Sequence, residues 1–357
     1  TMVRVKDSSV NENPVHMGMA LTGWMIKHQR ALNISRANDP DGLLRHMADD
    51  VKSALSVPLR AAGKMIGSLT VFNKRTEEAF DEMDQRFLSI VAGQSAQVIE
   101  SARLAEEEKR LASLKEELKV AGRLQASLMP IEFPIVPGYD VFGRNVPAGE
   151  VGGDCYDVLR LDEHRVLLSL GDVSGKGASA ALLMANAQAI IRSQFAAAAG
   201  GEINLSKLVK SVSEYIAQWS GHEKYITLFL GVVNAADHTI EYVNAGHNPP
   251  MIWRKGGTIE TLESTGIPMG MFPGMEYEMG VAQLEPNSRL VIFTDGVTEL
   301  FNEADEEFGE ERLEAFLHEH CECDSPEFAG RLYDLLEKYR GKREPSDDIT
   351  LLTVRRL

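Results

Sequence analysis

The chain has 357 residues, of which 44% are hydrophobic and 25% are charged, an ordinary composition for a globular protein. Its length allows two or three domains at roughly 100–200 residues each. Its 53 Asp and Glu residues outnumber its 37 Lys and Arg residues, so the formal net charge is −16. Nucleic acid and anionic lipid attract basic surfaces, and the composition therefore predicts no nucleic acid and no membrane among the partners.

The first hundred residues have the pattern of one mixed α/β unit. Two short runs of strand-like composition, Ser53–Leu59 and Met65–Phe72, predict two strands joined by a tight connection. Asp81 predicts the start of a helix, because an Asp side chain accepts hydrogen bonds from the free N–H groups of a first turn. Before Ser53 no opening helix and no earlier strand is predicted.

The helix that begins near Asp81 is predicted to continue into a linker. Two series of apolar residues repeat every seven positions there, offset by three: Leu104, Leu111 and Leu118, and then Leu114, Ala121 and Leu128. Glu, Lys and Arg fill the positions between them, and this pattern predicts a parallel dimeric coiled coil. A single amphipathic helix lying on its own domain is the alternative. Pro130 ends the helical pattern.

Strand-like and helical runs follow one another from Tyr139 to Leu357. Strands are predicted at 166–170, 225–233, 240–243, 290–294 and 349–354, and helices at 178–198, 205–219, 310–320 and 326–339. Neighbouring strands are not each separated by one helix, which disfavours a simple parallel Rossmann sheet. The pattern predicts a single α/β (α+β) domain.

Four Asp-bearing turns lie beside strands of this domain. They are GGDCYD (152–157), GDVSGKG (171–177), TDGVTE (294–299) and SDDIT (346–350). Burying an Asp beside a strand costs several kcal/mol unless a positive group compensates the charge, and few basic residues adjoin these turns. A hard divalent cation would compensate them, and ligand sets made only of oxygen favour Mg²⁺ or Mn²⁺ over zinc.

Other catalytic chemistries fit the sequence less well. In GDVSGKG only three residues separate Gly171 from Gly175, and a glycine follows Lys176, so the spacing is not that of a Walker loop. Cys155 does not begin the C-x5-R loop that a cysteine phosphatase needs. His247 lies in an Asn/Gly/Pro turn and is interpreted as structural. Three cysteines cannot make a disulfide framework, which predicts a reducing, cytoplasmic location.

The four turns, in this order and with NAGHNPP (244–250) between the second and third, resemble the SpoIIE/RsbU-type branch of the PPM (PP2C-like) serine/threonine phosphatases. The resemblance covers about 139–357 and implies a β-sandwich flanked by helices. It implies hydrolysis of phosphoserine or phosphothreonine by a water activated between two Mn²⁺ or Mg²⁺ ions. The implied substrate is a phosphorylated STAS-type anti-anti-sigma protein. A catalytically inactive signalling scaffold of the same fold is the alternative.

The resemblance also implies a role for individual residues around the second ion. Asp172 would bridge the two ions, and the main-chain carbonyl of Val173 would help to bind the second one. Asp154 would lie beside that second ion and contact it through a water. Asp172 and Asp154 are therefore the predicted catalytic carboxylates.

The first ion would be held by residues of the last two turns. Asp295 is one predicted ligand, and either Asp347 or Asp348 is the other, since the sequence alone does not separate them. The eukaryotic-type enzymes bind the substrate phosphate with an Arg near their N-terminal strand. Arg144 is the nearest candidate for that role in this chain.

The earlier part of the chain resembles known signalling modules. Residues 1–100 resemble the later part of a GAF sensory domain through SVPLR, IGSLTVFN and a Phe80–Asp81 pair that opens a long helix. The segment 118–130 is similar to the lead-in helix of the phosphatase family. The implied organisation is a partial GAF domain (1–100) that receives an unknown signal, a coiled-coil linker (101–130) that forms a homodimer, and a phosphatase domain (139–357) regulated through the linker.

Overall fold

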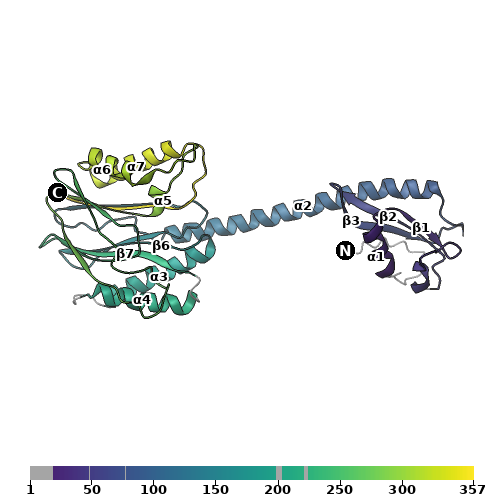
Figure 1. Ribbon diagram of the computed structural model, residues 1–357, viewed down its shortest axis with the longest axis horizontal. Helices are drawn as coiled ribbons and strands as arrows, with labels where there is room; N and C mark the ends of the chain where they lie inside the picture. The colour runs from purple at the N-terminus through teal and green to yellow at the C-terminus, as the bar shows by residue number, and fades with distance from the viewer. Residues whose placement is uncertain (1–18, 48, 77, 198–202, 221–223) are drawn as a thin grey trace. The chain divides into compact units, whose positions relative to one another are not determined.

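The computed structural model describes residues 19–47, 49–76, 78–197, 203–220 and 224–357 (Figure 1). The chain divides into two compact units, Thr1–Ser113 and Leu114–Leu357. Helix α2 (Glu82–Ala126) contributes residues to both units. Among the described residues, none of the helices combines the length and the apolar composition that crossing a membrane requires.

The first unit is a three-stranded antiparallel sheet with a helix on each face. Strands β1 (Leu32–Ser35), β2 (Ser53–Ala61) and β3 (Lys64–Phe72) lie in that order. Because successive side chains of a strand point to opposite faces, β2 contributes to two separate apolar clusters. Helix α1 (Met19–His28) packs on one face and the first turns of α2 pack on the other. The buried residues of the two helices are Leu21 and Met25 in α1, and Leu88, Ala92 and Ala96 in α2.

Two sequence predictions for this unit are confirmed. Strands β2 and β3 are joined by only Ala62 and Gly63, both with positive φ, which is the backbone of a tight two-residue hairpin turn. Asp81 caps α2, because its Oδ1 accepts a hydrogen bond from the N–H of Asp84 at 2.9 Å. The Asp84 Oδ2 accepts one from the N–H of Asp81 at the same distance, so the cap is reciprocal.

The expectation that nothing regular precedes Ser53 is wrong. Helix α1, strand β1 and a short 3-10 helix (Leu43–His46) all lie there. Strand β1 has only four residues, too few to show a repeat of two, and no acidic residue marks the first turn of α1. These elements form through tertiary packing on β2 rather than through a local signal. Residues 1–18 of the predicted sensory domain lie outside the described residues.

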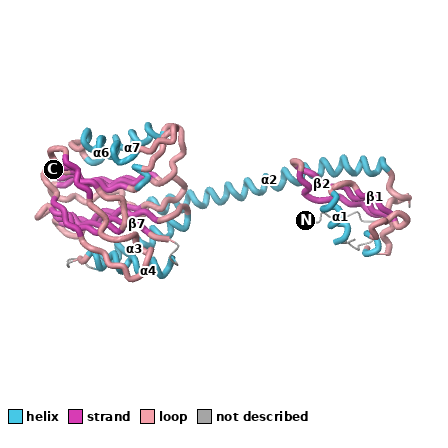
Figure 2. The backbone as a smooth tube through the Cα atoms, viewed as in Figure 1, coloured by secondary structure: helices cyan, strands magenta, loops and turns pink. Residues whose placement is uncertain are grey.

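The second unit is a β-sandwich of two five-stranded antiparallel sheets, as predicted (Figure 2). One sheet has the order β10-β9-β12-β13-β4, formed by β10 (Thr258–Thr261), β9 (Met251–Arg254), β12 (Arg289–Phe293), β13 (Ile349–Arg356) and β4 (Tyr139–Val146). The other has the order β11-β8-β7-β6-β5, formed by β11 (Gly280–Gln283), β8 (Thr239–Ala245), β7 (Ile226–Asn234), β6 (Arg165–Val173) and β5 (Cys155–Arg160).

Helices cover the outer face of each sheet (Figure 1). Helices α3 (Ala178–Ala197) and α4 (Leu205–Ser220) pack on the β5–β8 side, and α6 (Gly309–His320) and α7 (Ser325–Arg340) pack on the β12–β13 side. A third apolar cluster fills the space between the sheets. The central strands are therefore buried on both faces, which explains why β6 and β12 read as continuous apolar runs without alternation.

The predicted strands and helices of this unit are present, with small shifts at their ends. The last residue predicted for the helix at 178–198 lies outside the described residues. Five further strands, β4, β5, β9, β10 and β11, were not predicted. Three of them have four residues each, and β4 and β5 contain Asp, Asn, Gly or Arg that weaken a strand pattern.

Candidate active site

Two of the predicted carboxylates meet at the end of the β5–β6 pair. Cys155 at the start of β5 lies opposite Gly171 of β6, so Asp154 and Asp172 occupy the next pair of positions. Their side chains lie close enough for each to affect the pKa of the other. The antiparallel register therefore brings together the first and the second of the four Asp-bearing turns.

The other carboxylates lie at the end of the β12–β13 pair in the facing sheet. Phe293 pairs with Leu351, and the one-turn helix α5 (Asp295–Thr298) begins two residues later. Gly296 passes so close to β13 that an added Cβ would lie 2.0 Å from the main-chain oxygen of Asp348. This close approach places Asp295 beside the Asp347–Asp348 turn, and a larger residue than glycine would prevent it.

Hydroxyl groups join the carboxylates of the two sheets. The Asp154 Oδ2 accepts a hydrogen bond from Thr294 Oγ1 at 2.8 Å and another from Thr350 Oγ1. Asp154 is buried and comes from one sheet, whereas both threonines come from the other. The sequence did not single out these threonines, although Thr294 directly precedes Asp295 and Thr350 lies two residues after Asp348. All four Asp-bearing turns therefore converge at one end of the sandwich.

The two adjacent Asp residues of the SDDIT turn have different environments. The Asp348 side chain is buried, and its Oδ1 accepts a hydrogen bond from the N–H of Ala148 at 2.8 Å. Its Oδ2 accepts from the N–H groups of Gly153 at 2.7 Å and Asp154 at 3.3 Å. A Cβ on Gly152 would lie 2.3 Å from that Oδ2. Asp348 therefore anchors the GGD turn through Oδ2 and the loop before that turn through Oδ1.

Asp347 keeps a more open position. Its Oδ1 accepts a hydrogen bond from the N–H of Asp348 at 3.0 Å, and its Oδ2 lies 2.9 Å from the Nζ of Lys176. The side chain is 41% exposed. Its charge raises the pKa of both Asp172 and Asp295, so it faces the carboxylate cluster.

The carbonyl of Val173 lies next to the Asp172 carboxylate. An added Cβ on Gly153 would lie 3.0 Å from the Val173 oxygen and 3.2 Å from Asp172 Oδ1. The second glycine of the GGD turn thus leaves room beside both of the oxygen atoms predicted to face the second ion.

Burial and mutual repulsion disfavour the charged forms of these carboxylates. Desolvation, followed by the charge of Asp295, raises the pKa of Asp172 to about 7. Desolvation and the charge of Asp347 raise the pKa of Asp295. Desolvation and the charge of Asp172 raise the pKa of Asp154 well above its ordinary value. A group of carboxylates that repel one another has the electrostatics of a cation site.

The donor set fits hard divalent ions. It consists of carboxylate and carbonyl oxygens, which Mg²⁺ and Mn²⁺ prefer. No three Asp, Glu, His or Cys side chains within the described ranges are arranged to hold an ion together. Mg²⁺ binds to few protein oxygens and retains several waters, so carboxylates that lie near one another without forming a closed ligand cage are compatible with hydrated ions.

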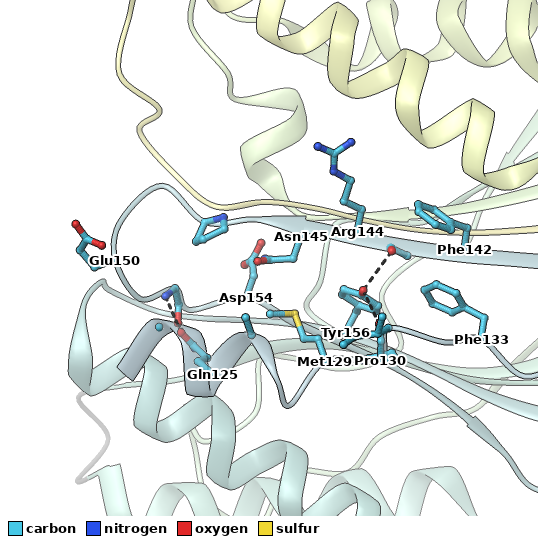
Figure 3. A pocket seen from close by; sticks show the side chains of 16 residues that line it. Gln125, Met129, Pro130, Phe133, Phe142, Arg144, Asn145, Glu150, Asp154 and Tyr156 are labelled. Carbon is cyan, nitrogen blue, oxygen red and sulfur yellow. Dashed lines mark hydrogen bonds between the residues drawn. The ribbon is translucent and has the colours of Figure 1, made fainter. Parts of the chain in front are cut away.

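Three other residues considered for catalysis do not face the cluster as reactive groups. His247 is buried, its Nδ1 lies 3.0 Å from Thr227 Oγ1, and desolvation lowers its pKa to about 4, so it is a neutral structural residue. Burial raises the pKa of the Cys155 thiol, which is therefore no nucleophile. Arg144 stacks on the Tyr333 ring at 4.4 Å and extends away from Asp154 (Figure 3).

A pocket of about 300 Å³ lies between the end of α2, strand β4 and Asp154 (Figure 3). On its α2 side, Gln125 donates a hydrogen bond from Nε2 to the Gly152 carbonyl at 2.7 Å and accepts one from the Gly152 N–H at 3.0 Å. At its apolar end, the Tyr156 hydroxyl donates to the carbonyls of Pro130 and Gly143. The lead-in helix is thus attached to the turn that carries Asp154.

Comparison with known families identifies this arrangement. Residues 162–357 match the family described as stage II sporulation protein E (SpoIIE), and residues 3–100 match the GAF domain. The chain belongs to the SpoIIE family. Its phosphatase domain is of the PPM type, that of protein serine/threonine phosphatases.

This SpoIIE-family chain is similar to a named phosphatase along most of its length. It is 29% identical over 245 residues to the phosphoserine phosphatase RsbU of Bacillus subtilis (strain 168), an alignment that covers 68% of this chain and 71% of RsbU. It covers less than half of the length of two further relatives, the protein IcfG of Synechocystis sp. and the phosphoserine phosphatase RsbP of Bacillus subtilis.

Solved structures share the sandwich. The PP2C domain of SiaA from Pseudomonas aeruginosa superposes with a TM-score of 0.60 at 21% identity, covering 69% of this chain and 98% of that domain. The RsbU and RsbW domains of Rv1364c from Mycobacterium tuberculosis give a TM-score of 0.53 at 26% identity, covering 64% of this chain and 63% of that structure. The predicted fold class is confirmed.

Proposed function

We propose that this chain removes phosphate from phosphoserine or phosphothreonine on a protein substrate, with two Mn²⁺ or Mg²⁺ ions held at the carboxylate cluster. The observation that carries the proposal is the convergence of Asp154, Asp172, Asp295 and Asp347 at one end of the sandwich, with raised pKa values for the first three. Such carboxylates destabilise the fold unless cations neutralise them, so their presence together is explained by metal binding.

The proposed ligands follow from the family resemblance, and the hydrogen bonds of the last turn separate Asp347 from Asp348. Asp172 would bridge both ions, with the Val173 carbonyl on the second ion and Asp154 near it through a water. Asp295 and Asp347 would hold the first ion. Asp348 is assigned an anchoring role, because main-chain N–H groups already occupy both of its oxygens. When bound, the two ions would lower the pKa of a water and stabilise negative charge on the phosphoryl oxygens.

The proposed substrate is a phosphorylated STAS-type anti-anti-sigma protein in the cytoplasm. The support is the resemblance to the SpoIIE/RsbU branch and the name of RsbU, a phosphoserine phosphatase. The three cysteines are free thiols, which fits a reducing compartment.

We further propose the organisation expected from the sequence: a sensory GAF domain (1–100), a dimerising linker (101–130) and a phosphatase domain (139–357). Leu104, Leu111 and Leu114 of the linker are 52%, 62% and 52% exposed in the single chain. Burial of these leucines against a second copy of α2 would remove apolar surface from water at both heptad positions.

Contacts at the end of α2 support regulation through the linker. An added Cβ on Gly122 would lie 1.9 Å from the Glu150 carbonyl, so the helix lies directly against the loop before the GGD turn. One turn later Gln125 holds both polar groups of the Gly152 main chain. A signal that moves this helix end would therefore displace Gly152 and, with it, Asp154.

A second set of contacts follows immediately. The Leu128 carbonyl accepts hydrogen bonds from Gln188 Nε2 at 3.1 Å and Arg192 Nη2 at 2.8 Å, both on α3. The Arg192 guanidinium also forms an ion pair with the buried Asp157 of β5. Strand β6 carries Asp172 near its end, and a short loop joins it to α3. The lead-in segment therefore contacts the elements next to both predicted catalytic carboxylates.

The central test measures phosphate release from p-nitrophenyl phosphate with Mn²⁺ and after chelation. Wild type should turn over only with metal, and Asp172→Ala should release no phosphate while its circular dichroism stays native. Asp162→Ala, on an exposed turn where Asp162 pairs with Arg165, is the matched control and should keep full activity. Undiminished turnover by Asp172→Ala would sink the assignment. Metal binding without any turnover would favour the inactive scaffold.

The regulatory part is tested with Gln125→Ala. Each lost hydrogen bond weakens the attachment of α2 by about 0.5–1.5 kcal/mol, so this variant should need a higher Mn²⁺ concentration for half-maximal activity. Gln97→Ala changes an exposed glutamine of the same helix and should behave as wild type. Equal Mn²⁺ requirements for all three proteins would contradict regulation through this contact.

The dimer is tested by sedimentation. Leu111→Asp should dissociate the full chain into monomers, because a charge at a heptad position cannot be buried without a partner. Leu182→Asp, which changes an even more exposed leucine on α3, should leave the oligomeric state unchanged. A wild-type protein that sediments as a monomer would refute the coiled coil.

A further inference from the structure

Lys176 places a positive charge at the edge of the carboxylate cluster. It lies in the loop between β6 and α3, and its Nζ is 2.9 Å from Asp347 Oδ2. The same ammonium donates a hydrogen bond to the Ser346 carbonyl. Lys176 thus contacts the Asp that is the proposed ligand of the first ion, and does not contact the neighbouring Asp that anchors the GGD turn.

The electrostatics of this lysine extend beyond one ion pair. The hydrogen bond to Asp347 is the main cause that raises the pKa of Lys176, and the charges of Asp348 and Asp295 add to it. In return, the charge of Lys176 lowers the pKa of Asp295. The ammonium therefore partly neutralises the carboxylates to which the first ion would bind.

The loop allows this side chain to move. Gly175 and Gly177 flank Lys176 with φ values of +86° and +78°, a backbone region that glycine adopts without strain. The lysine side chain is 64% exposed, so most of its surface faces solvent. A lysine ammonium is a compact charge on a flexible stem, which can exchange one anionic partner for another.

We propose that Lys176 is an exchangeable counter-ion, which pairs with Asp347 in the absence of metal and with the phosphate of the substrate once a divalent ion occupies Asp347. This inference rests on the proposed function. An ion with two charges and an ammonium cannot share one carboxylate without repelling each other, so metal binding would release Nζ. A substrate phosphate bound beside the first ion would then offer Nζ an anionic partner, and lysine is a common ligand for phosphate. Arg144, the candidate for this phosphate contact in the sequence, has its guanidinium stacked on the Tyr333 ring instead.

The proposal predicts two effects of opposite direction. Removal of the ammonium eliminates a competitor for Asp347, so the protein should bind Mn²⁺ more tightly. It also eliminates a phosphate contact, so the enzyme should bind its substrate more weakly. Removal of a lysine with a merely structural role would not tighten Mn²⁺ binding while weakening substrate binding.

The experiment uses the full chain and measures Mn²⁺ binding by isothermal titration calorimetry and turnover of p-nitrophenyl phosphate at saturating Mn²⁺. Lys176→Met should bind Mn²⁺ about three- to fivefold more tightly, the size expected for an exposed ion pair. Its KM should rise about tenfold, the size expected for a charge-assisted hydrogen bond to phosphate. Lys176→Arg should restore a KM close to that of wild type.

The matched control is Lys210→Met, which removes the same charge from a surface ion pair with Glu276. It should leave both the Mn²⁺ affinity and KM unchanged. Unchanged or weaker Mn²⁺ binding by Lys176→Met, or an unchanged KM, overturns the role of Lys176 while the metal-dependent function stands. Absence of Mn²⁺ binding by wild type overturns the proposed function and this inference together.

Discussion

Strand β12 has a charged residue near each end, and the two charges have opposite surroundings. At the start of the strand, Arg289 is completely buried, yet its guanidinium donates to the carbonyls of Cys321 and Cys323 and to the hydroxyls of Ser325 and Thr353. It also stacks on the Phe328 ring at 4.3 Å. Each nitrogen of this guanidinium therefore donates to a neutral partner. These hydrogen bonds join β12 and β13 to the segment between α6 and α7.

The end of the same strand leads into charges that lack such compensation. Asp295 follows β12 directly after Thr294, and the neighbouring carboxylates raise its pKa instead of stabilising its charge. Asp172 and Asp154 are affected in the same way. The comparison teaches that burial alone does not indicate function. Burial lowers the pKa of Arg289 to about 10, but neutral hydrogen-bond acceptors still hold its guanidinium in place. A group of like charges that repel one another instead requires a ligand.

The largest expected effect on stability is at Arg289, whose buried charge has hydrogen-bond partners. Arg289→Met should lower the free energy of unfolding by about 3–5 kcal/mol, because it leaves several buried carbonyl and hydroxyl groups without a donor. Urea denaturation would measure this change. The folded fraction should keep its Mn²⁺-dependent activity. A loss of less than about 1 kcal/mol would mean that the network around Arg289 contributes little to the fold.

A second buried group provides a pH-dependent test. The folded state favours neutral His247, so the free energy of unfolding should fall as the pH drops from about 6.5 toward 4, by up to about 3 kcal/mol from this residue. His247→Asn should have a shallower pH dependence over this interval than wild type. Parallel pH profiles for the two proteins would show that His247 titrates normally in the fold.

A substitution in the carboxylate cluster should change the free energy of unfolding in the opposite direction. Asp172→Asn removes a charge whose pKa is raised to about 7, and should increase the stability of the metal-free protein at pH 8 by about 1–2 kcal/mol. The same variant should show no thermal stabilisation by Mn²⁺. Differential scanning fluorimetry in chelator and in Mn²⁺ measures both quantities. A less stable metal-free variant would contradict the view that this carboxylate strains the fold.

The smallest predicted difference separates two neighbours in the chain. Asp348→Asn should cost about 1–2 kcal/mol of stability, because it weakens the main-chain hydrogen bonds that hold the GGD turn. Asp347→Asn should change stability by less than about 0.5 kcal/mol but should weaken Mn²⁺ binding. The reverse pattern would exchange the anchoring and ligand roles of these residues.

Much of the architecture was accessible from local patterns. The Asp81 cap, the tight turn between β2 and β3, and the apolar runs of β6 and β12 each depend on neighbours within a few residues, and all were predicted. The elements that were missed, α1, β1 and the short strands at the sheet edges, have little local signal. They form because a neighbouring strand or helix buries them.

The candidate site shows the same division. The sequence by itself determined which residue types carry the chemistry: Asp-bearing turns beside apolar strands, with glycines next to them. The tertiary structure alone decided how these residues are used. Asp347 and Asp348 are adjacent in sequence, but only the fold directs three N–H groups toward Asp348 and leaves Asp347 facing Lys176. The physical reason is that partners of a charge come from other strands and loops, and their positions depend on how the two sheets pack.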